Sequence, residues 1–202
     1  CEWNVAISSS STDIFLNSYK VNGIYPGEIL EGGYPRIDNT INSSRNIIFS
    51  KLQKYGINID SGKPILLFSP TWKGTNIHDA TDDINQIIKE TLRLVSEFNN
   101  YNILLKVHPY VYSKMSMEPQ IQEYLVSDLF DANELMGVID ILITDYSSIF
   151  FDYLVTNKPI VFYAWDNDLY LNERGLYISK DELPGPIADN IEELVALIKN
   201  IN

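Results

Sequence analysis

The chain contains few of the side chains that cross-link proteins or bind transition metals. Its 202 residues include one cysteine, Cys1, and two histidines, His78 and His108. An internal disulfide is therefore impossible. A structural zinc site built from cysteine and histidine is excluded as well, because such sites use four of these ligands. We expect no metal and no cofactor in this chain.

Positive charge is also scarce. Lys and Arg number 15 against 27 Asp and Glu, which gives a formal net charge of −12 at pH 7. Nucleic-acid binding relies on many contacts between cations and phosphates, and attachment to an anionic membrane by charge needs a basic patch. The composition argues against both. An anionic ligand would need a local device here, such as a few placed cations or a helix N-terminus.

Long apolar runs and a leader are not found either. No run approaches the roughly 18–20 residues of a membrane span, so we expect no transmembrane segment. The first residues, Cys1-Glu2-Trp3-Asn4, lack the basic and apolar regions of a signal peptide. Because no initiator methionine precedes them, we interpret the chain as part of a larger cytoplasmic protein.

Glycine-rich nucleotide signatures are missing as well. The sequence has no Gly-x-Gly-x-x-Gly, no Walker-type loop and no Gly-x-Ser-x-Gly elbow. Dinucleotide oxidoreductases, P-loop ATPases and α/β-hydrolases therefore lose their main support.

What the chain does contain is an alternation of apolar strands and amphipathic helices. Four short runs rich in β-branched residues suit strands buried on both faces of a parallel sheet: 65–68, 103–107, 139–143 and 160–163. Weaker strand candidates are 5–7 and 28–31. Apolar spacing and capping signals predict helices at 44–55, at 84–98, after Asp131 and after Asn190.

This order of elements predicts a Rossmann-like, doubly wound parallel α/β domain. We assign it to residues 39–202. Residues 1–38 are assigned to the end of a preceding region together with an entry strand or helix. The polar segment 39–44 is expected to be a loop or hinge.

The run Lys106-Val107-His108-Pro109 stands at the end of a predicted buried strand, where Pro109 is expected to stop the strand. Open α/β sheets bind ligands just beyond the carboxyl ends of their strands. His108 is therefore a candidate functional residue. The structural alternative is a histidine that hydrogen-bonds within its own loop.

A second predicted strand ends in Thr144, Asp145, Tyr146, Ser147 and Ser148, and an aromatic-rich helix follows. Either serine is a natural N-cap, and the hydroxyl and N–H groups of a helix start hold phosphate without any lysine. The alternative is an ordinary cap with no ligand.

Within that helix, Asp152 is placed where a carboxylate accepts hydrogen bonds from ribose hydroxyls, and its alternative is a solvated helix charge.

Two further segments carry candidate ligand groups. After the first buried strand come Thr71, Trp72 and Lys73, whose alternatives are core packing for Trp72 and plain surface for Lys73. In Gly32-Gly33-Tyr34-Pro35-Arg36, the guanidinium of Arg36 suits phosphate or carboxylate. A structural tie from Arg36 to Asp38 or to the backbone is an equal alternative.

Taken in order, these motifs resemble the C-terminal half of the CDP-glycerol glycerophosphotransferase family of teichoic-acid and capsule polymerases and primases. The resemblance covers about residue 28 to the C-terminus. The segments that carry it are 33–38, 69–73, 106–109, 142–148, 158–163 and 184–186.

The resemblance implies the nucleotide-binding half of a GT-B glycosyltransferase-like enzyme, which moves glycerol phosphate from CDP-glycerol, or a related CDP-polyol donor, to a polymer hydroxyl and releases CMP. It implies that His108 is catalytic and contacts the donor diphosphate, that Ser147 and Ser148 bind phosphate, and that Asp152 faces the ribose. It places three further residues at the nucleotide cleft: Arg36, Thr71 and Lys73. We add Trp72, Pro109, Thr144 and Asp145 to this binding set.

The family's acceptor is a lipid-linked polymer, which would be bound through an N-terminal half outside these residues, at the inner face of the membrane. That half would also supply the catalytic base, so we expect the chain alone to be inactive. Two other functions stay open: a sugar-nucleotide glycosyltransferase or epimerase of the same fold, and a non-catalytic module that binds a nucleotide or an anion.

Overall fold

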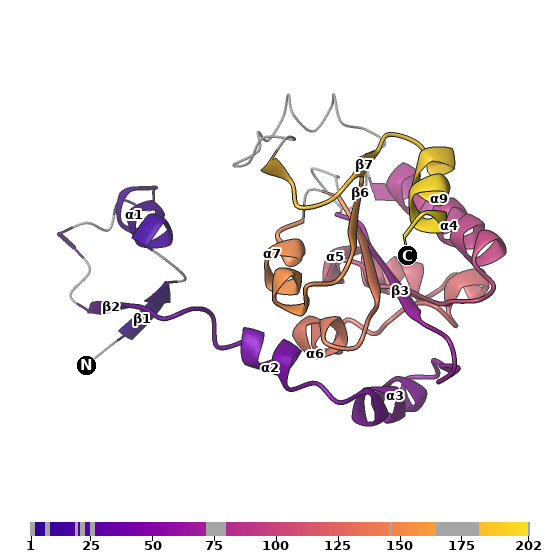
Figure 1. The fold of residues 1–202 in the computed structure, drawn as a ribbon, viewed down its shortest axis with the longest axis horizontal. Helices are drawn as coiled ribbons and strands as arrows, with labels where there is room; N and C mark the ends of the chain where they lie inside the picture. The colour runs from indigo at the N-terminus through magenta and orange to yellow at the C-terminus, as the bar shows by residue number, and fades with distance from the viewer. Residues whose placement is uncertain are drawn as a thin grey trace.

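The fold is described from a computed structural model, which covers the chain except for residues 1–2, 7–8, 19, 21–22, 25–26, 72–79, 146, 165–181 and 202. Its centre is a parallel sheet with the strand order β4-β3-β5-β6-β7 (Figure 1). The strands are β3 (Ile65–Ser69), β4 (Asn102–Leu105), β5 (Ile141–Thr144), β6 (Ile160–Tyr163) and β7 (Ile187–Ala188). This arrangement confirms the four strong strand predictions and adds the two-residue β7.

The strands are apolar on both faces because each face packs against a separate core. In β3, Leu66 and Phe68 belong to one core, whereas Ile65 and Leu67 belong to the other. All four are at most 1% exposed. The period of two along the strand thus divides one apolar run between two helix layers.

Helices cover both faces of the sheet (Figure 1). One layer is formed by α4 (Ala80–Glu97), α5 (Pro109–Met115) and α9 (Ile191–Lys199); the other is formed by α3 (Arg45–Lys54), α6 (Ala132–Met136) and α7 (Ile149–Tyr153). The 3₁₀ turns η1 (Pro119–Ile121) and η2 (Leu154–Thr156) complete the body. The expected doubly wound α/β domain is confirmed. No helix among the described residues combines the length and apolarity needed to cross a membrane.

Two predicted helix caps form as expected. The carboxylate of Asp131 accepts the backbone N–H of Asn133 at 2.7 Å and that of Glu134 at 3.3 Å at the start of α6. The amide oxygen of Asn190 accepts the N–H of Glu193 at 2.9 Å at the start of α9. Each cap satisfies backbone donors that the helix itself leaves unpaired.

The N-terminal residues form a separate unit. Strands β1 (Trp3–Ala6) and β2 (Glu28–Glu31) pair with each other in parallel, beside α1 (Ser9–Ser18) and apart from the large sheet (Figure 1). This confirms the strand candidate 28–31 and residues 5–6 of the candidate 5–7, whose last residue, Ile7, lies outside the described residues. The division of the chain between residues 38 and 39 stays a prediction.

The expected loop at 39–44 is partly wrong, because α2 (Ile37–Ile41) includes its first three residues. Thr40 of this helix is buried at 3% exposure, and the amide of Asn133 in α6 donates to its hydroxyl at 3.4 Å. Packing against α6 orders a segment whose polar composition, taken alone, favours a loop.

Candidate functional site

The strand order places a topological switch point between β3 and β5. From β3 the chain passes to β4 at one edge of the sheet and then returns to β5 on the other side of β3. The loops after β3 and β5 therefore leave in opposite directions, and ligands of such folds bind in the crevice between them.

A cavity of about 560 Å³ lies at the carboxyl ends of these strands, within the usual size range for small-molecule sites. The segments that line it follow three neighbouring strands: 69–71 after β3, 106–110 after β4, and Ser147 with Ile149 after β5. Asp128, Phe130 and Ala132 complete the lining. Thr71, His108, Pro109 and Ser147 of the predicted site thus meet at one cavity.

His108 is held in a defined orientation at the start of α5. Its Nδ1 accepts the backbone N–H of Tyr110 at 3.3 Å, and its ring lies 4.9 Å from the Tyr110 ring, centroid to centroid. A nitrogen that accepts a hydrogen bond carries no proton, so the neutral ring carries its proton on Nε2. His108 is therefore an N–H donor in the wall of the cavity.

Pro109 does not end the strand as expected. Strand β4 ends at Leu105, and Pro109 is the first residue of α5. Proline suits this position because its fixed φ matches the helix and its missing N–H would have no partner there. The turn between Leu105 and Pro109 brings both Lys106 and His108 to the cavity.

Asp145 and Thr71 tie the two loops of the switch point together. The Asp145 carboxylate accepts the Thr71 backbone N–H at 2.9 Å and the Thr71 hydroxyl at 2.5 Å. Asp145 is 3% exposed, and Thr144, which is fully buried, donates to the carbonyl of Ser69 at 2.9 Å. Thr144 and Asp145 shape the cavity from behind its lining.

The two candidate serines differ in position. Ser147 lines the cavity, and its hydroxyl accepts the N–H of Ile149 at 3.4 Å. Ser148 precedes α7 with φ −65° and ψ −3°, makes no side-chain capping hydrogen bond, and is not in the described lining.

Arg36 and Asp152 bind each other. Arg36 Nε lies 2.6 Å from Asp152 Oδ2, and Nη2 lies 3.1 Å from Oδ1, a bidentate pair. The Asp152 side chain is 10% exposed, and the amide of Asn133 also donates to it at 3.4 Å. The pair joins the segment before α2 to α7. Neither residue is in the described lining of the cavity.

Lys106 is a site residue that the motif analysis did not single out. It is 9% exposed, it lines the cavity, and its Nζ donates to the carbonyl of Ser127 at 2.9 Å. The available signal was a lysine placed inside an otherwise apolar run at a strand end. Trp72 and Lys73 lie outside the described residues.

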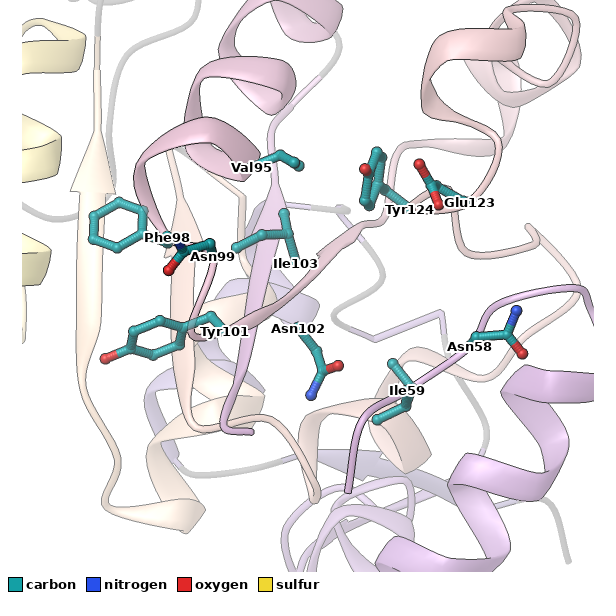
Figure 2. A pocket seen from close by; sticks show the side chains of 10 residues that line it. All are labelled: Asn58, Ile59, Val95, Phe98, Asn99, Tyr101, Asn102, Ile103, Glu123 and Tyr124. Atoms are coloured by element: carbon teal, nitrogen blue, oxygen red, sulfur yellow. The ribbon is translucent and has the colours of Figure 1, made fainter. Parts of the chain in front are cut away.

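A second cavity, of about 250 Å³, lies near the amino end of β4 (Figure 2). Its central amide, Asn102, accepts the N–H of Asp60 and donates to the carbonyls of Asp60 and Lys63. Glu123 adds a carboxylate to the lining, and burial raises the pKa of Tyr124 to about 12, which keeps that phenol protonated. This lining offers no cation to an anionic ligand.

Comparison with known proteins agrees with the geometry. A family model described as CDP-Glycerol:Poly(glycerophosphate) glycerophosphotransferase matches residues 1–202. The chain belongs to this family. It is 34% identical to the teichoic acid glycerol-phosphate transferase of Staphylococcus aureus (strain NCTC 8325 / PS 47), over 99% of this chain and 52% of that protein. It is 30% identical to the teichoic acid ribitol-phosphate polymerase TarL of the same strain, over 96% of this chain and 35% of TarL.

A solved structure shares the fold. The wall teichoic acid polymerase TagF, as the H444N variant with CDPG after a 30 minute soak, superimposes with a TM-score of 0.69 and 29% identity, covering 97% of this chain and 46% of that one. The likeness confirms the Rossmann-like, GT-B-type fold class. The chain spans about half the length, or less, of these relatives.

Proposed function

We propose that this chain binds the CDP-glycerol donor of a glycerophosphotransferase, and that the protein containing it transfers glycerol phosphate to a polymer hydroxyl. The observation that carries this proposal is the cavity at the switch point, whose lining brings together the N–H donor His108, Thr71 and Ser147. The family supplies the donor class, since its description names CDP-glycerol. The TagF structure soaked with CDPG supports the same donor.

In the proposed reaction, an acceptor hydroxyl oxygen attacks the phosphorus of the glycerol phosphate group. A new P–O bond forms, the P–O bond to CMP breaks, and the hydroxyl proton passes to a base. Negative charge develops on the leaving phosphate of CMP, and a preorganised N–H donor stabilises such charge. We assign this role to the Nε2–H of His108.

The other site residues take supporting roles in this proposal. Thr71, Pro109 and Ser147 contact the donor, and Thr144 and Asp145 hold the loops that carry them. The bidentate partners Arg36 and Asp152 act by fixing the segment before α2 rather than by touching the phosphates. Trp72, Lys73 and Ser148 stay predicted binding residues.

A CDP-ribitol donor is the second candidate, because TarL is a ribitol-phosphate polymerase at 30% identity. The two donors share cytidine and diphosphate and differ only in the polyol. We favour glycerol because the family description and the relative at 34% identity both name it. We further propose that the acceptor is a lipid-linked polymer and that the protein containing this chain acts on it at the inner face of the membrane.

Calorimetry with the 202-residue chain tests donor binding. We expect tighter binding of CDP than of UDP, and CDP binding that His108→Ala weakens. Equal affinity for CDP and UDP, or no binding of either, would contradict the proposal. With a whole transferase containing this chain, CMP release from CDP-glycerol measured beside CDP-ribitol and UDP-glucose decides the donor.

A further inference from the structure

Lys106 occupies an unusual electrostatic position. Lys106 is a cation that is only 9% exposed, in a chain with a net charge of −12. It stands two residues before His108 in the wall of the same cavity. An ammonium group has three N–H donors. Among the described residues, the Nζ of Lys106 donates one hydrogen bond, to the Ser127 carbonyl at 2.9 Å. Within the described part of the chain, no carboxylate forms an ion pair with Lys106.

Two aspartates influence Lys106 without forming an ion pair with it. Burial lowers the pKa of Lys106, while Asp128 and Asp131 act on it in the opposite direction from beyond ion-pair distance. Asp131 is committed elsewhere, since its carboxylate caps α6 and accepts from the amide of Asn39 at 3.3 Å. A buried cation without a counter-ion is costly to keep, and an anionic ligand removes that cost.

Lys158 shows what a structural lysine looks like in the same fold. Its Nζ also donates to a backbone carbonyl, that of Ile139, but it pairs with the carboxylate of Asp140 at 3.6 Å. It precedes β6, at the amino ends of the strands, far from the cavity lining. Lys106 also donates to a backbone carbonyl, but it has no ion pair with a carboxylate among the described residues and borders the cavity instead.

We propose that Lys106 is a substrate-binding residue whose ammonium group contacts the diphosphate of the donor beside His108. This inference rests on the proposed function and deepens it, because it names the group that neutralises the donor's charge. Two N–H donors of Lys106 face phosphate oxygens when the donor is bound, while the third keeps the Ser127 carbonyl. A charge-assisted contact of this kind is stronger than a neutral hydrogen bond.

The test compares CDP with cytidine, which lacks the phosphates, on three forms of the 202-residue chain. Lys106→Met keeps most of the buried aliphatic stem and removes the charge. We expect it to weaken CDP binding by at least about 10- to 150-fold, the range for one of its two hydrogen bonds to phosphate, and to leave cytidine affinity unchanged. Lys158→Met makes the same change in net charge at the other end of the sheet, and we expect CDP affinity within about twofold of the original chain.

Three outcomes overturn the inference. Equal CDP affinity in Lys106→Met and the original chain, with the original chain still preferring CDP to cytidine, removes Lys106 and leaves the proposed function intact. Loss of cytidine and CDP binding alike in Lys106→Met assigns the residue a structural role. Failure of the original chain to prefer CDP removes the proposed function as well. If Lys106→Met does not fold, Lys106→Gln, which retains a hydrogen-bond donor toward Ser127, replaces it with the same expected selectivity.

Discussion

The two ends of the central sheet differ in how their polar groups are used. At the amino end, Asn102 holds the loop around Asp60, and Asp140 accepts the backbone N–H of Ile65 at 2.9 Å while Lys158 lies 3.6 Å away. At the carboxyl end, Lys106 and His108 border a cavity of about 560 Å³. Charge is matched within the protein at the amino end, whereas at the carboxyl end it borders the cavity that we propose binds the donor.

Residue type alone does not distinguish the polar groups that stabilise the fold from those that we propose bind a ligand. Each end carries a lysine whose Nζ donates to a backbone carbonyl, Lys158 at the amino end and Lys106 at the carboxyl end. The difference is whether a protein partner completes each group, because an uncompleted buried group lowers stability and persists only where something else compensates. Substitutions at the carboxyl end should therefore change binding or catalysis, and those at the amino end should change stability alone.

The largest effect is expected at His108. In a whole transferase containing this chain, His108→Ala should lower kcat by about 10²–10³, the typical loss for one donor that stabilises developing charge. His108→Asp is the matched control, because aspartate keeps a helix-capping oxygen for the Tyr110 N–H but has no N–H donor. Recovery of the rate in His108→Asp would reassign His108 to capping.

The second effect compares neighbouring serines. Ser147→Ala removes a hydroxyl from the cavity and should weaken CDP binding by roughly 10- to 150-fold. Ser148→Ala, outside the described lining, should weaken CDP binding far less than Ser147→Ala does. Calorimetry on both variants measures the contrast. Equal effects of the two substitutions would show that the loop as a whole, rather than the Ser147 hydroxyl, matters.

At the amino end, Gly137 tests stability without binding. A Cβ at this position would meet the Thr40 carbonyl oxygen at 2.2 Å and the Ser43 Cβ at 2.6 Å. Gly137→Ala should therefore lower the free energy of unfolding by about 1–3 kcal/mol through forced displacement of neighbouring backbone. Denaturant unfolding measures this loss, and CDP affinity of the folded fraction should stay the same. Weakened binding in the folded fraction would mean that the two ends are coupled.

The smallest effect is expected for Asn102→Ala, which removes the side chain that bridges the Asp60 and Lys63 backbone near the cavity of Figure 2. The contacts are partly exposed, so we expect a loss of about 1 kcal/mol in the free energy of unfolding. CDP affinity should not change. A larger change in CDP affinity than in stability would place the nucleotide in this second cavity instead.

The sequence alone predicts the parts of the fold that local physics controls. The buried strands stand out because a parallel sheet requires apolar side chains on both faces, as in 65–69. The helix predicted at 84–98 is α4, which begins earlier, at Ala80. The cap residues Asp131 and Asn190 follow from short-range hydrogen bonds that sequence spacing reveals.

What escaped the sequence depends on contacts between distant residues. Arg36 and Asp152 are 116 positions apart, and only the fold shows that they pair with each other. Lys106 stands in a predicted buried strand, but only the fold shows its place in the cavity wall and its Ser127 partner. The sequence also could not distinguish Ser147 from Ser148, because only the fold shows which of the two adjacent side chains lines the cavity.

We propose that the nucleotide binds at the carboxyl ends of β3, β4 and β5. Backbone amide NMR of the 202-residue chain during a CDP titration tests this most directly. We predict that the amide shifts change most at the non-proline residues of 69–71, 106–110 and 147–149, with little change at 58–59, 99–103 and 123–124. Changes concentrated in the second set, around the cavity of Figure 2, would contradict the account.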